Sequence, residues 1–151
     1  MTLKLLREAK TSLLADMQFK AGVLHDCRTL SEAGSSVRCF CWDVKGDIEK
    51  FTANTASMVT AVLGNLEIAE QMGYLHDKGL TDILQALVGK FIHGQNPELF
   101  NNELKGVSGI VWDEFDADRN GVLQITKDSI GMTENAFSEN VCELEKLVFE
   151  E

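Results

Sequence analysis

The chain has 151 residues, of which 44% are hydrophobic and 25% charged, a composition typical of soluble globular proteins that excludes extensive disorder. Its 24 acidic and 14 basic residues give a net charge of −10, which repels phosphate backbones and argues against nucleic acid as a partner. No run approaches the roughly 18 consecutive apolar residues of a membrane span. We therefore expect a single domain over residues 1–151 that binds neither nucleic acid nor membrane.

The four cysteines, at positions 27, 39, 41 and 142, have a spacing that fits no zinc site. The first residues, MTLKLLREAK, are charged throughout and lack the apolar stretch of a secretory signal. We therefore expect a cytoplasmic protein whose cysteines are reduced, with Cys39 and Cys41 as buried thiols.

The first 30 residues predict one long helix, because apolar residues recur on one face. Thr2 can cap this helix, and the glycine at position 34 ends it. The apolar face contains Leu6, Leu13, Met17 and Leu24. Residues 37–42 follow, a short run with Phe40 and Trp42 that favours one short strand.

Further helices are predicted over residues 47–71 and 81–93, where apolar residues again recur at helical spacing. Asn96-Pro97-Glu98 is typical of a helix start and predicts a fourth helix up to Phe115. A last helix is expected from Thr133, with Phe137, Val141, Leu144 and Val148 on one side. The sequence thus predicts a mainly α fold, a single-domain helical bundle with one short strand at 37–42.

Oxygen-bearing residues between the last two helices recur at the spacing of a calcium-binding loop. Calcium takes six to eight oxygen ligands, which a twelve-residue loop supplies at positions 1, 3, 5, 7, 9 and 12. The expected metal ligands are Asp116, Asp118, Asn120, the carbonyl of Val122, Gln124 through a water, and Asp128. Gly121 stands where such a loop turns sharply, and Leu123 is the apolar residue expected to point into the core.

With the aromatic residues Trp112 and Phe115 in front of this loop, the stretch 110–130 resembles the EF-hand family. The resemblance implies a lone helix–loop–helix near the C-terminus with calcium as its cofactor. The family closes its loop with a bidentate glutamate, whereas this chain has Lys127, a cation that repels calcium. Asp128 is therefore expected to close the loop. Because EF-hands occur in pairs, a lone hand also implies a helical partner or a homodimer.

Two other readings of the sequence remain open. Asn120-Gly121 is also a favoured type I′ hairpin turn, which predicts an α+β fold with a hairpin at 110–126 joined by the strand at 37–42. His25-Asp26, within the first helix, resembles the phosphoacceptor box of histidine kinases and phosphotransfer domains.

No nucleophile elbow, P-loop or dinucleotide-binding pattern occurs, so the chain is not expected to be an enzyme. We expect a small acidic EF-hand-like protein that binds calcium and acts by contacting another protein. The first alternative is a non-enzymatic α+β adaptor or interaction protein without a metal. The second alternative is a helical histidine phosphotransfer protein that uses His25.

Overall fold

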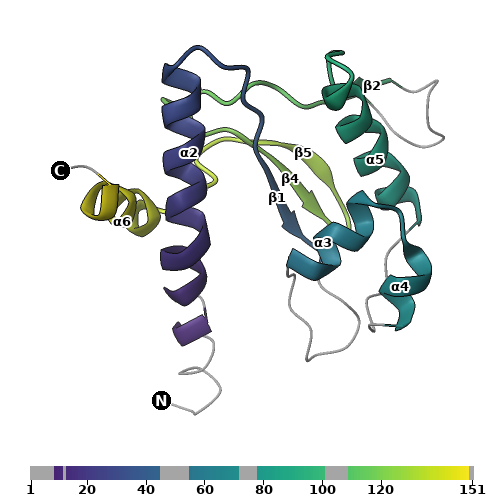
Figure 1. Cartoon of the computed structure of the whole chain (residues 1–151), viewed down its shortest axis with the longest axis horizontal. Helices are drawn as coiled ribbons and strands as arrows, with labels where there is room; N and C mark the ends of the chain where they lie inside the picture. The colour runs from purple at the N-terminus through teal and green to yellow at the C-terminus, as the bar shows by residue number, and fades with distance from the viewer. Residues whose placement is uncertain (1–8, 12, 45–54, 72–77, 101–108, 150–151) are drawn as a thin grey trace. The chain divides into compact units, whose positions relative to one another are not determined.

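The structure of the chain is a computed structural model that describes residues 9–11, 13–44, 55–71, 78–100 and 109–149 (Figure 1). Its contacts divide the chain into two compact units. The helical unit consists of Met1–Cys39, Glu114–Gly121 and Glu134–Glu151. The sheet unit consists of Phe40–Asp113 and Val122–Thr133.

Among the described residues, the helical unit contains an N-terminal helix and a C-terminal helix. A π-helical turn, η1 (Asp16–Lys20), leads into α2 (Ala21–Glu32), and α6 (Glu139–Phe149) packs against both (Figure 1). Gly34 follows α2 with φ +80°, a conformation that glycine adopts without strain and that ends helices. The buried residues of α2 are Ala21, Leu24 and Cys27.

The sheet unit contains, among the described residues, one three-stranded and one two-stranded sheet. The larger sheet consists of β1 (Phe40–Asp43), β4 (Val122–Thr126) and β5 (Ile130–Thr133), with β4 in the middle. β4 runs parallel to β1, with Leu123 opposite Phe40, and antiparallel to β5. The smaller sheet pairs β2 (Glu98–Leu99) with β3 (Ile110–Val111). The helices described in this unit are α3 (Thr55–Val62), α4 (Leu66–Gln71) and α5 (Lys78–Ile92).

The core of the sheet unit forms between α5 and the strands. Leu84 and Leu87 of α5 and Leu123 and Ile125 of β4 have no exposed surface. The indole of Trp112 joins this cluster and meets the ring of Phe40 edge-on at a centroid distance of 5.7 Å. Leu123 and Ile125 alternate with Gln124 and Thr126 along β4, so one face of this central strand is apolar and packs into the cluster.

The prediction of a mainly α helical bundle is wrong, since the fold is α+β. The fourth helix, expected from Pro97 to Phe115, does not form in the described part of that range. Glu98 and Leu99 instead pair with Val111 and Ile110, and the N–H of Trp112 donates to the carbonyl of Pro97 over 3.0 Å. Leu99 is buried, so long-range packing outweighs the local helix-start signal of Asn96-Pro97-Glu98.

The expected helix–loop–helix is absent for the same reason. Residues 112–116 have no helical structure, and the residues after Gly121 form strand β4. The last helix begins at Glu139 rather than Thr133, because residues 130–133 belong to β5. The side-chain oxygen of Ser138 accepts from the N–H of Val141 over 3.4 Å and caps that helix.

The α+β alternative names the correct fold class but the wrong hairpin. Strand β4 pairs with β5 through the turn at residues 127–129, and not with residues 110–119 across Asn120-Gly121. The short strand expected at 37–42 is present as Phe40–Asp43 and joins β4, as that alternative expected.

Two of the remaining helix predictions agree with the structure where it describes them, and a third agrees only in part. Residues 9–11 and 13–32 are helical, and α5 covers the helix expected at 81–93. The helix expected at 47–71 is two helices, α3 and α4, with residues 45–54 outside the described part. Gly64 separates the two with φ +68°. No described helix has the length and apolar character needed to cross a membrane.

Candidate functional site

The first half of the expected calcium loop is a tight turn closed by protein groups. The Oδ1 atom of Asp116 accepts from the N–H groups of Asp118 and Arg119 at 2.9 and 3.3 Å. The Oδ2 atom of Asp116 lies 3.3 Å from Nε of Arg119, and the N–H of Asn120 donates to the carbonyl of Asp116. Asn120 has φ 48°, which asparagine tolerates in such turns.

A second arginine, Arg28, forms a hydrogen bond with the side chain of Asn120. Nη2 of Arg28, from α2, donates to Oδ1 of Asn120 over 3.3 Å. Arg119 also lies 3.6 Å from a carboxylate oxygen of Glu134. Two of the oxygen atoms expected to bind calcium are therefore already paired with arginine nitrogens, which supply positive charge where the metal would sit.

The second half of the expected loop is extended rather than curved. Val122 and Gln124 lie in strand β4, and Oε1 of Gln124 accepts from the hydroxyl of Thr133 over 3.1 Å. Asp128 lies in the turn after the strand. At about 3.3 Å per residue, strand β4 carries Asp128 well away from Val122 instead of folding back toward it. Within the described residues, no cluster of three or more His, Cys, Asp or Glu side chains could hold a metal.

These contacts give calcium binding no support, and the calcium site of Asp116, Asp118, Asn120, Val122, Gln124 and Asp128 stays a prediction. The spacing of oxygen-bearing residues that suggested it also suits a turn in which the Asp116 carboxylate accepts from the backbone N–H groups of Asp118 and Arg119.

A buried charged cluster in the helical unit was not predicted from the sequence. Glu145 of α6 is only 3% exposed, and its Oε2 atom accepts from Nη1 of Arg28 over 2.8 Å. Its Oε1 atom lies 3.4 Å from Nδ1 of His25. Arg28 therefore connects α2 to α6 through Glu145 and to the 116–120 turn through Asn120. One sequence signal was available, because Glu145 follows buried Val141 by four residues and so interrupts an apolar face.

The imidazole of His25 is held on several sides. Its ring stacks on the ring of Phe149 with a centroid distance of 4.3 Å, and its Nε2 atom lies 3.5 Å from the hydroxyl of Thr29. With Nδ1 beside Glu145, both ring nitrogens face protein groups. This arrangement gives no support to phosphotransfer through His25, which stays a prediction.

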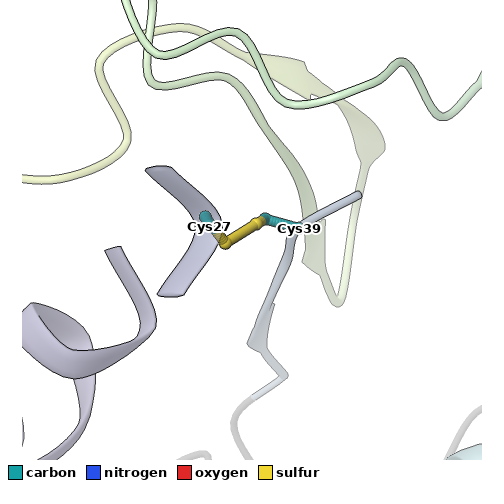
Figure 2. Close-up of a disulfide and its surroundings, with 2 residues drawn as sticks. All are labelled: Cys27 and Cys39. Carbon is teal, nitrogen blue, oxygen red and sulfur yellow. A yellow bond between two sulfur atoms is a disulfide. The ribbon is translucent and has the colours of Figure 1, made fainter. Parts of the chain in front are cut away.

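The structure joins Cys27 of α2 to Cys39 by a disulfide (Figure 2). The expectation of reduced thiols is therefore wrong for this pair, because the fold brings together two cysteines that are 12 residues apart in the sequence. Cys41 and Cys142 keep their thiols. Cys41 is exposed rather than buried, because it alternates along β1 with Phe40 and Trp42, which pack against the core from the other face of the strand.

The helical unit also exposes many large apolar side chains. Val148, expected on one apolar side of the last helix with Val141, is 61% exposed, and its neighbour Leu147 is 82% exposed. The exposed apolar residues of the described N-terminal helix are Leu13, Leu14, Met17, Phe19, Val23 and Leu30.

No protein-family model matches the chain, and no curated protein matches its sequence.

Proposed function

We propose that the protein is a non-enzymatic α+β interaction protein that binds another protein through the helical unit, without a metal. The observation that carries the proposal is that η1, α2 and α6 expose large apolar side chains, of which Phe19, Val23 and Leu30 lie at helical spacing. Soluble proteins rarely leave large contiguous apolar areas in water unless those areas bind something. Full burial of such a side chain contributes roughly 1.5–3 kcal/mol, and completing the burial of a half-exposed one contributes about half of that. Several of them together are therefore needed to offset the entropy lost on association.

The contacts inside the helical unit support this proposal, because they fix the surface before a partner arrives. The Cys27–Cys39 disulfide, the Arg28–Glu145 ion pair and the Arg28–Asn120 hydrogen bond link α2 to three other segments of the unit. A surface that is already ordered loses less conformational entropy on binding, which favours affinity.

The location of the protein is a separate question. The cytoplasmic location expected from the sequence stays a prediction. The Cys27–Cys39 disulfide favours an oxidising compartment, where such bonds form and persist.

Affinity capture with matched surface variants tests the proposal. Wild-type protein, a Val23→Ser/Leu30→Ser variant and an Ile92→Ser variant are used to capture proteins from a cell extract. Ile92 is 72% exposed on α5 of the sheet unit, so its replacement is the control. We expect the wild type and the Ile92 variant to capture the same proteins. The double variant should capture at least tenfold less of them, as expected when central interface residues are replaced. Equal capture by all three variants would contradict the proposal.

Calcium provides an independent test, because a metal that binds the native state must raise its stability. We expect millimolar calcium to leave the midpoint of thermal unfolding unchanged, since Arg119 pairs with Asp116 and Arg28 donates to Asn120. The measurement is differential scanning calorimetry with calcium or with chelator. A calcium-dependent rise that disappears in Asp116→Ala would instead support the EF-hand interpretation.

A further inference from the structure

One line of side chains along η1 and α2, which we call the stripe, combines apolar and acidic character. It consists of Phe19, Val23, Asp26 and Leu30, at spacings of four, three and four residues that place them on one side of a helix. Phe19, Val23 and Leu30 are 61%, 48% and 50% exposed. The buried residues of α2, which are Ala21, Leu24 and Cys27, project from a different side.

The carboxylate of Asp26 has no ion-pair partner within the described part of the chain. Its side chain is exposed and makes no hydrogen bond or ion pair there. The neighbouring cations of the same helix have other carboxylates: Nζ of Lys20 lies 2.7 Å from Asp16, and Arg28 pairs with Glu145. Asp26 is therefore a carboxylate, set among apolar side chains, that is available to a cation from outside.

A second copy of the chain fits the stripe poorly. Two antiparallel stripes related by a two-fold axis would place Phe19 opposite Leu30, and Val23 opposite Asp26. Each Asp26 would then be buried against an apolar side chain without a cation, which costs free energy. Two chains of net charge −10 would also repel each other on approach.

We propose that the stripe binds an amphipathic helix of a basic partner protein, with apolar side chains against Phe19, Val23 and Leu30 and a lysine or arginine beside Asp26. This inference rests on the proposed function and specifies its partner by chemistry. The negative charge of the whole chain would speed the approach of such a helix, and the apolar contacts would hold it in a helix-against-helix geometry.

Two synthetic peptides of equal length test the inference, one of leucine and lysine and one of leucine and glutamate, both with the same helical apolar face. Fluorescence anisotropy measures their affinity for the full chain. We expect the lysine peptide to bind at least tenfold more tightly than the glutamate peptide. Val23→Ser/Leu30→Ser should weaken its binding tenfold or more, and Ile92→Ser should leave it unchanged. Circular dichroism confirms that each variant is folded.

Charge reversal separates local pairing at Asp26 from attraction by the whole chain. Asp26→Lys should weaken lysine-peptide binding about fivefold, as expected for loss of a partly exposed ion pair, and strengthen glutamate-peptide binding. Asp128→Lys changes the net charge equally at an exposed turn of the sheet unit and is the matched control. Equal effects of the two substitutions would overturn the assignment of Asp26.

The remaining outcomes distinguish the two proposals. One outcome is that sedimentation reveals a dimer that Leu30→Ser abolishes, while neither peptide binds. The partner is then a second copy of the chain, which overturns the basic helix but leaves an interaction function in place. A second outcome is that neither peptide binds, the chain is monomeric, and capture from extracts still depends on Val23 and Leu30. This outcome would overturn only the proposed class of partner. Failure of peptide binding, self-association and capture together would overturn both.

Discussion

Glu145→Ala is expected to lower the free energy of unfolding by about 3 kcal/mol, the lower end of the range for removing one member of a buried ion pair. Glu145 is 3% exposed and accepts from Arg28 over 2.8 Å. Without it, the Arg28 guanidinium, 21% exposed, keeps its charge in a partly buried place with no carboxylate beside it. Urea unfolding followed by far-ultraviolet circular dichroism measures the effect, and amide hydrogen exchange in α2 and α6 locates it.

Two further variants show whether the ion pair or the helix itself is responsible. Glu143→Ala removes an exposed carboxylate from the same helix and should change stability by less than about 0.5 kcal/mol. The double variant Arg28→Met/Glu145→Met should recover much of the loss, because paired apolar side chains can replace a buried ion pair. Equal effects of Glu143→Ala and Glu145→Ala would show that the Arg28–Glu145 contact contributes little.

Local patterns in the sequence predicted the parts of the fold that depend on neighbouring residues. The N-terminal helix and α5 follow from apolar residues at helical spacing. Leu123 is fully buried as expected, but as part of strand β4 rather than of a calcium loop. Asn96-Pro97-Glu98 misled because its preference is local. The strand at Glu98–Leu99 exists because residues 110 and 111 pair with it, which no short window of sequence reveals.

The candidate site shows the same limit more sharply. The order Asp116, Asp118, Asn120, Gly121 suits both a calcium loop and a turn closed by backbone N–H groups. The closed turn is favoured partly by the hydrogen bond from Arg28 to Asn120, two residues that are 92 positions apart in the sequence. The disulfide is a similar case, because any two of the four cysteines could pair and their spacing alone does not select a pair.

Loss of the Cys27–Cys39 disulfide is the second change expected to have a large effect. Cys27→Ser should lower the free energy of unfolding by about 2–3 kcal/mol, because the bond closes a short loop and restricts the unfolded chain. Both sulfur atoms belong to buried residues, 5% and 7% exposed, so the serine hydroxyl also loses hydrogen bonds to water. Thermal and urea unfolding with and without a phosphine reductant measure the effect.

The matched control is Cys142→Ser, which leaves the disulfide intact and should change stability much less. Reductant should lower the unfolding midpoint of the wild type and of the Cys142 variant, yet leave Cys27→Ser unaffected, because that variant has no bond to reduce. Thiol titration should find two reactive groups in the unfolded, unreduced chain and four after reduction, the numbers expected from one disulfide among four cysteines. Four thiols before reduction would show that the pair is not oxidised. If reduction also weakens binding of the lysine peptide, the disulfide maintains the stripe on α2 in its binding geometry, and binding would then depend on an oxidising environment.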